Sequence, residues 1–245
     1  MKLVFSTLLI SLLLNYNILF AQKITYKEGN LFGLSVNVGA SSFANALAGT
    51  HLYGIGNNKR FKIGYGFRLT NFFGSDLDFA TAPAKYTSGK SSIAALFSNN
   101  IPANIDTISL QKVQTNFLNA GIYIAYTLPC WKNRIELGVN IDAAGFTFGS
   151  RQDVLYKNNT SSAKPTAFNL LLISDSDKGS LNSEWYVSYW ATKQLSIKAG
   201  YQFLFTEYTT DTKIQQLPNS GEKNDRFRLK SPMLLFGIIY APFKK

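Results

Sequence analysis

The clearest pattern in the chain is a strict alternation of apolar side chains with polar or small ones. Between residues 61 and 71 every second side chain is apolar, and the positions between them carry Lys62, Arg68, Thr70 and two glycines. Successive side chains of a strand point to opposite faces, so this segment predicts a β-strand with one apolar and one polar face.

The same period of two returns along the chain after residue 30. It predicts strands at 32–40, 46–55, 61–71, 118–126, 135–144, 184–191, 195–206 and 228–240. No stretch after Ala21 approaches the length of an apolar membrane-spanning helix. In the last strand Pro232 cannot donate a ladder hydrogen bond, so a bulge or a strand start is expected there. The expected fold class is all-β, with about eight strands and ten as the alternative count.

The connections between these strands alternate between short and long. Residues 57–59, 129–134 and 192–194 form tight turns, whereas the segments 74–113, 149–183 and 207–225 are long and polar. Only the first outer hairpin, at 41–45, is short. Outer-membrane barrels have short turns on one side and long loops on the other, whereas a β-sandwich gives no reason for loop lengths to segregate. The pattern favours a transmembrane antiparallel up-and-down β-barrel over a sandwich.

The order of these features resembles the small bacterial outer-membrane β-barrel proteins of the OmpA/OmpX type. The resemblance rests on the signal-peptide order of the first residues, on the number and phase of the strands, and on the closing aromatic segment Leu234–Phe243. It extends from Leu31 to Phe243. It is a resemblance of architecture, and no motif assigns a particular member. It implies a barrel embedded in the bacterial outer membrane. The terminal aromatic residue is displaced here, because Lys244 and Lys245 follow Phe243.

The first residues have the order of a secretory signal peptide. Lys2 supplies a positive charge, an apolar run follows from Leu3 to Leu14, and Ala21 precedes a polar stretch. That order predicts export and cleavage after Ala21. The alternative is a transmembrane anchor, which needs about 20 apolar residues, and Asn15 and Asn17 interrupt the run. The expected organisation is a signal peptide at 1–21, a periplasmic segment at 22–30 and the barrel at 31–243.

The charge balance is basic. The chain has 25 Lys and Arg against 14 Asp and Glu, and removal of the predicted signal peptide changes the net charge from +11 to +10. An exported protein rarely meets nucleic acid, so none is expected as a partner. Outer-membrane lipid and acidic surface glycolipid are the expected counterparts of these cations, and the protein is expected to be a monomer. A solvated basic rim is the simpler alternative.

The interior of an eight-stranded barrel is just wide enough to be filled by side chains. The polar phase of the predicted strands points charged groups into it, and charges in so enclosed a space must be paired. We expect two stacked charged layers that act as a structural plug, with a gated ion path or a ligand cup as the functional alternative. The expected lumen charge network consists of Lys62, Arg68, Glu136, Asp142, Lys198 and Arg228.

Few residues could support catalysis or metal binding. His51 is the only histidine and Cys130 the only cysteine, so the chain can form neither a zinc cluster of these residues nor an internal disulfide. A hydrolase would need a serine and an orienting carboxylate beside His51, and neither is adjacent to it in the sequence. No catalytic residue, metal or cofactor is assigned.

One long predicted loop contains an apolar segment, residues 166–173, that is too hydrophobic for a freely solvated loop. It is expected to fold over the barrel mouth as a lid, or to present a patch for a partner. Its apolar side chains are Phe168, Leu170, Leu171 and Leu172.

Three functional hypotheses follow from these features. The first is a structural or surface-interaction barrel that works through its long external loops, which are surfaces where function concentrates. The second is transport or binding of a small apolar ligand that enters beneath the lid. The third is a glycolipid-modifying enzyme built around His51, which would need a serine and a carboxylate near it in space.

Overall fold

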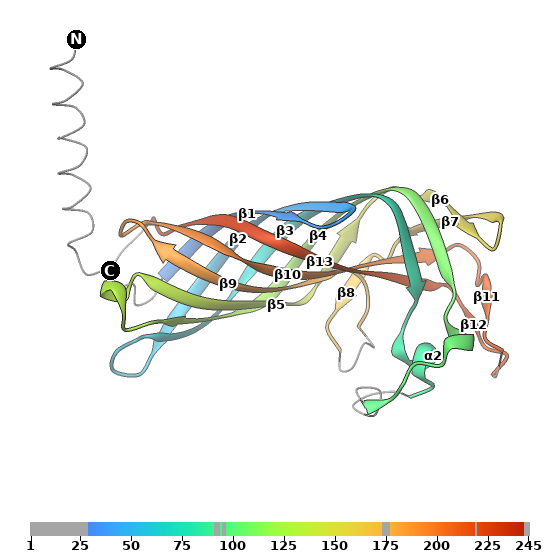
Figure 1. The fold of residues 1–245 in the computed structure, drawn as a ribbon, viewed down its shortest axis with the longest axis horizontal. Coiled ribbons are helices and arrows are strands. Elements are labelled where there is room, and N and C mark those ends of the chain that lie inside the picture. The colour runs from blue at the N-terminus through green and yellow to red at the C-terminus, as the bar shows by residue number, and fades with distance from the viewer. Residues whose placement is uncertain (1–28, 91–93, 95–96, 173–176, 219, 243–245) are drawn as a thin grey trace, which may run out of the picture.

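The computed structural model describes residues 29–90, 94, 97–172, 177–218 and 220–242. The predicted signal peptide, most of the predicted periplasmic segment, Ile173 and Phe243 lie outside the described residues. Within these ranges no helix is long and apolar enough to cross a membrane. The described chain is almost entirely antiparallel β-structure (Figure 1).

Eight strands form a closed ring in which each strand is antiparallel to both of its neighbours. In ring order they are β1 (Gly29–Val38), β2 (Ser42–Ile55), β3 (Phe61–Thr81), β4 (Thr107–Thr127), β5 (Ile135–Phe148), β9 (Leu181–Trp190), β10 (Leu195–Thr210) and β13 (Arg226–Tyr240). The pair β1–β13 closes the ring, with a register from Phe32 opposite Tyr240 to Val38 opposite Leu234. The predicted fold class, an antiparallel β-barrel of eight strands, is confirmed.

The polarity of this barrel is inverted relative to a soluble protein. Its outer surface carries a belt of exposed apolar side chains, among them Phe67 and Trp185, each 61 % exposed. Its interior holds buried polar side chains such as Asn37, Thr70 and Ser196. An apolar surface of this extent is suited to lipid, and a closed ring leaves no unpaired strand edge within it. The barrel is therefore membrane-spanning, with its tight turns at the left in Figure 1.

Beyond the membrane belt the strands form a second, smaller ring. The hairpin of β6 (Gln152–Tyr156) and β7 (Asn159–Pro165) lies between β4 and β10. On the other side, β13 pairs directly with β3 through residues 227–228 and 80–81. The order β3–β4–β6–β7–β10–β13 therefore closes on itself. This six-stranded ring, called the cap from here on, lies at the right-hand end of the barrel in Figure 1.

The cap is filled by an apolar core. Phe79 and Tyr208 are fully buried in it and meet edge-on, with ring centroids 5.2 Å apart. Other buried members of this core are Leu110, Ile108, Val154, Ala163 and Phe227. A separate apolar cluster that includes Leu31, Leu52, Trp190 and Ile239 fills the tight-turn end. The lumen is thus closed by apolar side chains at both ends.

The transition from barrel to cap coincides with a change of phase in two strands. In β3 the even-numbered side chains are buried as far as Phe72, and the odd-numbered ones are buried from Leu77 onward. Asp76 lies between them with a left-handed backbone, φ 52°. Its partner strand β4 makes the same switch where two consecutive side chains, Gln111 and Lys112, are exposed. The switch turns apolar side chains of both strands into the cap core.

Two of the predicted long loops are largely wrong. Residues 74–81 and 107–113, expected in a loop, belong to β3 and β4, and the predicted loop 149–183 contains β6, β7, β8 (Phe168–Leu170) and the first residues of β9. The physical reason is that the cap is apolar inside and polar outside, as in a soluble protein. Its strands therefore have a polar composition that resembles that of loops.

The bulge or strand start expected at Pro232 is also wrong. β13 runs without a register shift from Thr209 opposite Arg226 to Leu195 opposite Tyr240, with Pro232 opposite Phe203. On its other side the pairing of β13 with β1 ends at Leu234, so Pro232 has no neighbouring strand there. A proline is tolerated at such an edge because a ladder hydrogen bond is not needed on both sides.

The remaining described elements are short. They are the helix α2 (Ala84–Ser88), the 3-10 helices η2 (Pro102–Asn104) and η3 (Trp131–Asn133), and the strands β11 (Gln215–Gln216) and β12 (Lys223–Asn224). α2 lies beside the outer end of the barrel, below the cap in Figure 1.

Truncation of the cap core should loosen the cap and leave the membrane ring intact. We expect Phe227→Ala to cost about 3–5 kcal/mol, the usual cost of removing a buried phenylalanine ring. The measurement is limited proteolysis of protein reconstituted in vesicles, where the variant should be cleaved in the cap at protease levels that the wild type resists. Phe236→Ala, which truncates a lipid-facing ring, is the control. Equal resistance of both variants would contradict a cap held by its core.

Candidate functional site

The charged residues of the lumen lie at two depths. The inner group, nearer the tight turns, is an ion pair between Lys62 on β3 and Glu136 on β5, both almost fully buried. Thr127 donates a hydrogen bond to the Glu136 carboxylate over 3.2 Å. A buried carboxylate and ammonium must be matched in this way, since an uncompensated charge in the interior costs several kcal/mol.

The second group lies nearer the middle of the lumen, and Glu184 of β9 is its hub. Its carboxylate is 3.3 Å from the Arg68 guanidinium and 3.0 Å from the Lys198 ammonium. Asn140 donates a further hydrogen bond to it over 2.9 Å. Arg68 also lies 3.8 Å from Asp142. The structure thus brings together five of the six residues of the expected lumen network, in two groups.

The two groups are electrically balanced. Three cations, Lys62, Arg68 and Lys198, face three carboxylates, Glu136, Asp142 and Glu184. Toward the cap the lumen continues as amides and hydroxyls: Asn119 donates to Asp142 over 2.8 Å, and Gln202 donates to Asn182 over 2.5 Å. The described lumen therefore holds two charge-balanced groups with hydrogen-bonded amides beyond them.

Arg228, the sixth residue of the expected network, is not in the lumen. On β13 the odd-numbered side chains point inward, and Arg228 shares the outward phase with Arg226 and Lys230. It contacts Glu207, which lies opposite it on β10, with 3.0 Å between Nη2 and Oε2. The expectation is corrected because the phase of β13 is fixed by Phe227, which is buried in the cap core.

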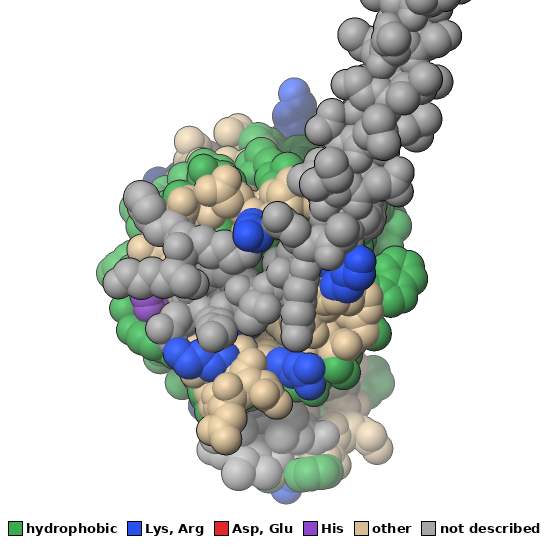
Figure 2. Space-filling view, turned by 90° about the vertical axis from the view of Figure 1, so that its left-hand side faces the viewer, with side chains coloured by type: hydrophobic (Ala, Val, Ile, Leu, Met, Phe, Trp, Pro, Cys, Tyr) green, Lys and Arg blue, Asp and Glu red, His purple; other side chains and the backbone are tan. Residues whose placement is uncertain are grey.

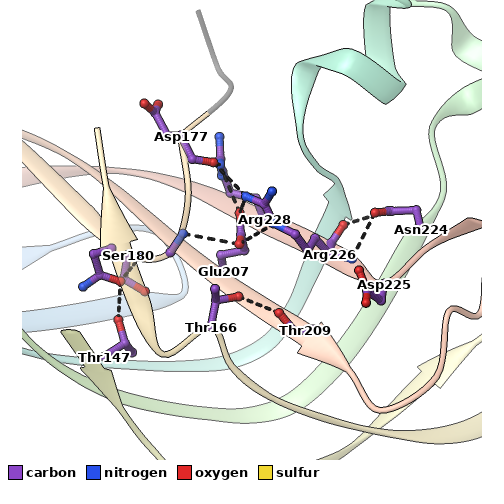
Figure 3. Close-up of polar contacts among 12 residues, drawn as sticks. Thr147, Thr166, Asp177, Ser180, Glu207, Thr209, Asn224, Asp225, Arg226 and Arg228 are labelled. Atoms are coloured by element: carbon purple, nitrogen blue, oxygen red, sulfur yellow. Dashed lines mark hydrogen bonds and ion pairs between the residues drawn. The ribbon is translucent and has the colours of Figure 1, made fainter. Parts of the chain in front are cut away.

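These outward residues form a clamp on the barrel wall (Figure 3). Arg226 binds Glu207 through two nitrogens, at 2.8 and 2.9 Å, and both arginines donate to the carbonyl of Asp177. Gly179 donates its backbone N–H to Glu207 over 3.3 Å. A bidentate arginine–carboxylate pair combines geometric specificity with strength. The clamp therefore fixes segment 177–180 against β10 and β13.

The apolar segment expected to form a lid belongs to the wall instead. β8 pairs with β5, and its Phe168 packs edge-on against Phe146 with centroids 5.8 Å apart. Phe168, Leu171 and Leu172 are exposed on the outside, and Asn169 is the buried residue of β8. Successive side chains of a strand point to opposite faces, so the inward direction of Asn169 places Phe168 on the outside of the wall instead of over the mouth. The mouth is closed by the cap, and not by Phe168, Leu170, Leu171 and Leu172.

A hollow of about 320 Å³ lies where β3 and β13 meet outside the barrel. It is called the seam pocket here, and its walls are Asp78 and Ala80 of β3 and Arg228, Leu229 and Lys230 of β13, with the α2 segment beside them. Asp78 accepts a hydrogen bond from Ser109 over 2.5 Å. Two cations, a carboxylate and an apolar wall could hold an anionic group that carries hydroxyls.

Charges on the cap are mostly paired with one another. Asp106 accepts a hydrogen bond from Tyr156 over 2.7 Å and lies 2.9 Å from the Lys157 ammonium. Burial raises the pKa of Tyr156, and its bond to Asp106 raises it further, while the same carboxylate raises the pKa of Lys157. Arg151 pairs with Asp211 in the same region. Arg228, which also pairs with Glu207, and Lys230 border the seam pocket.

His51 lies at the opposite end of the barrel from the cap. It is on the outward face of β2, near the tight turns, with Asn30, Tyr53 and Tyr65 around it. These neighbours are neither serine nor carboxylate, so the arrangement required by the enzyme hypothesis is not what the described residues form around His51. In the described part of the chain, no group of three or more His, Cys, Asp or Glu side chains could hold a metal ion.

The clamp and the seam pocket were missed by sequence reasoning. Glu207 follows the apolar outward positions of β10, so its outward direction could be read from the alternation. Its pairing with Arg226 and Arg228 needs the β10–β13 register, which the sequence does not state. The pocket depends on the β3–β13 contact across the ring, for which the sequence carries no local signal.

No protein-family model matches the chain, and no curated protein matches its sequence. Solved structures with a similar arrangement include Neisserial surface protein A, with 10 % identity, 86 % of this chain and 93 % of that one covered, and a TM-score of 0.34. Another is Ail, the attachment invasion locus protein of Yersinia pestis, with 8 % identity, 87 % and 97 % coverage and a TM-score of 0.32. De novo designed transmembrane β-barrels match with 10 % identity, 89 % and 97 % coverage and a TM-score of 0.32.

The closure of the ring and its inverted polarity identify the fold without these likenesses. The chain has the fold of a small outer-membrane β-barrel, as its alternating pattern predicted.

The inner ion pair offers a test of the lumen as a plug. We expect Lys62→Met to lower the free energy of unfolding by about 3–5 kcal/mol, because it leaves the Glu136 carboxylate buried without its partner. The double change Lys62→Met with Glu136→Leu should recover most of that loss. Urea unfolding of vesicle-embedded protein measures both. A double variant as unstable as the single one would show that the pair is not the reason for the loss.

Proposed function

We propose that this protein is a closed, non-conducting outer-membrane barrel that binds acidic surface glycolipid at its outer end. The observation that carries the proposal is the seam pocket, where Arg228 and Lys230 border a hollow of about 320 Å³. Cations suit the phosphate or carboxylate groups of such a glycolipid, and Asp78 offers an acceptor for sugar hydroxyls.

The height of the pocket supports this ligand. Phe43, at the start of β2, lies opposite Phe73 on β3, with ring centroids 6.5 Å apart. Because aromatic rings line the membrane interface of such barrels, this pair marks the outer interface. Asp78 lies beyond Phe73 on β3 by about 13 Å along the barrel axis, for a strand tilted by about 40°. The pocket therefore reaches the level of lipid headgroups and their first sugars.

The filled lumen argues against transport. The cavity lined by Tyr123, Tyr186 and Lys198 inside the barrel has about 30 Å³, which is room for one or two water molecules. The ends of the lumen hold the two apolar clusters. The alternative function, passage or binding of an apolar ligand through the barrel, would require these clusters to move apart.

We also propose the export, the cleavage and the monomeric state that the sequence predicts. The chain would be exported by the signal at 1–21, cleaved after Ala21, and would act as a monomer without a cofactor. A surface protein as partner remains the second candidate, and the clamped segment 177–180 beside the exposed Leu171 and Leu172 would be its docking region.

Binding of glycolipid is tested with lipid A, a bis-phosphorylated glycolipid, added to the detergent-solubilised protein. We expect Lys230→Gln to weaken binding about fivefold, the effect of about 1 kcal/mol for one lysine near an anionic lipid. Lys164→Gln removes an exposed cation from β7 at the same end and should leave the affinity unchanged. An equal loss of lipid A affinity in both variants would indicate diffuse attraction to a basic surface. That result would contradict a binding site at the seam pocket.

Closure of the barrel is tested by electrical recording. The wild-type protein inserted into planar lipid bilayers should give no stepwise conductance, because apolar side chains fill both ends of the lumen. Discrete current steps that scale with salt concentration would contradict the closed barrel and favour the transport alternative.

A further inference from the structure

A cluster of polar side chains lies on the lipid-facing surface near the tight-turn end. In the outward phase of three adjacent strands, His51 is opposite Asn30 on one side and Tyr65 on the other. The imidazole Nδ1 is 2.6 Å from the side-chain oxygen of Asn30. The ring stacks on Tyr65 at 6.1 Å and meets Tyr53 edge-on at 4.5 Å. His51 and Asn30 therefore place hydrogen-bonding groups on a surface whose exposed large side chains are mainly apolar.

Directly beside this cluster the barrel wall has a slot. Gly49 lies in the same outward phase, flanked by Phe32 on β1 and Phe67 on β3, which are both well exposed. A Cβ added at Gly49 would meet only the Phe32 ring, at 3.9 Å, so the space above the glycine is open. The hollow has about 220 Å³, and His51, Asn30 and Tyr65 line its polar end.

The order of these features along the barrel matches the order of groups in a phospholipid. β2 ends at Ile55 in the tight turn, so the apolar slot at Gly49 lies deeper in the membrane than His51. The turn itself carries Lys59 and Arg60. From the bilayer interior outward, the surface thus presents an apolar slot, then hydrogen-bonding groups, then cations. An acyl chain, a glycerol ester region and a phosphate follow each other in the same sequence.

The charge of the tight-turn end fits an anionic headgroup. The described residues of the turns 56–60, 128–134 and 191–194 include no Asp or Glu. They include Lys59, Arg60, Lys132 and Lys193, whereas Arg134 is buried and donates to the carbonyls of Trp190 and Ala191. Figure 2 looks onto this end, where Lys and Arg side chains lie within a rim of hydrophobic ones and no acidic side chain is visible. Juxtamembrane cations of this kind attract anionic lipid.

We propose that this slot is a binding site for one phospholipid of the inner leaflet. Its acyl chain lies over Gly49 between Phe32 and Phe67. Its ester and phosphate oxygens accept hydrogen bonds from the group around His51, and the cations of the tight turns balance the phosphate. The tight turns of outer-membrane barrels face the periplasm, so the ligand is a phospholipid and not the surface glycolipid of the opposite leaflet. This site is independent of the seam pocket.

The single histidine makes the site directly observable. We would titrate phosphatidylglycerol with unsaturated acyl chains into the protein in uncharged detergent micelles and follow the His51 ring protons by NMR. The expected result is a saturable shift. Gly49→Leu should weaken the apparent affinity about tenfold, the loss expected when about two methylene groups are displaced from the slot. Tyr65→Phe keeps the ring and removes the hydroxyl, and it should also weaken the affinity.

A matched control is available on the far side of the barrel. Ala199 lies in an apolar hollow of about 410 Å³ beside Ile197 and Phe236, and Ala199→Leu fills that hollow in the same way. It should leave the His51 shift unchanged, and gel mobility without heating should show that every variant remains folded. A His51 shift that grows linearly with phosphatidylglycerol concentration, without saturating, would overturn the site. An apparent affinity that is unchanged in Gly49→Leu would also overturn it. A shift that lipid A or added protein reproduces at the same concentrations would overturn the assignment to phospholipid.

Discussion

The structure depends on one constraint, which is that no backbone N–H or C=O can be left unpaired in hydrocarbon. A sheet satisfies it only by closing on itself, and β1–β13 pairing does so here. Closure fixes the phase of every strand, because each side chain must face either lipid or lumen. The outward aromatic belt and the inward ion pairs of Lys62 and Arg68 follow from that phase.

The same closure principle operates a second time beyond the membrane. Where the β1–β2 hairpin ends, β3 and β13 meet across the gap, and β6–β7 completes a ring of six. In water the favourable arrangement buries apolar side chains, so the apolar positions of β3 and β4 must point inward in the cap, whereas they point outward in the membrane. Asp76 accommodates that reversal with its left-handed backbone. The result is one continuous wall with a membrane-type barrel at one end and a soluble-type cap at the other.

The charges inside the barrel stabilise the fold, whereas the proposed binding sites lie at its two ends. The two charged groups in the lumen are balanced, with three cations against three carboxylates, so they contribute nothing to the basic excess of the chain. At the outer end Arg151 pairs with Asp211, and Arg228 and Lys230 border the seam pocket. At the tight-turn end the sequence of the described turns 56–60, 128–134 and 191–194 contains Lys and Arg and no Asp or Glu. The two binding sites that we propose lie at these two ends.

The sequence predicted the membrane ring well because alternation is a local signal that each strand repeats. It placed Lys62, Arg68, Glu136, Asp142 and Lys198 inward correctly, but it did not show that Glu184 is the hub of the second group. It failed where a non-local contact decides the outcome. The apolar residues after Thr166 were read as a lid because the β5–β8 pairing leaves no mark in the chain itself. Arg228 was also assigned to the wrong face, because apolar residues on both faces of β13 after Pro232 obscure an alternation that runs through the whole strand.

The most direct test of this account is a disulfide across the ring at the cap. In a Cys130→Ser background, Ala80→Cys with Arg228→Cys places two thiols on directly opposite residues of β3 and β13. Opposite residues in an antiparallel pair lie within the Cα separation that a disulfide needs. Rapid cross-linking of vesicle-embedded protein is expected under mild oxidation. None is expected for Ala80→Cys with Leu234→Cys, because Leu234 lies between Val38 of β1 and Tyr201 of β10. If the first pair cross-links no faster than the second, the strands do not meet and the barrel is not capped.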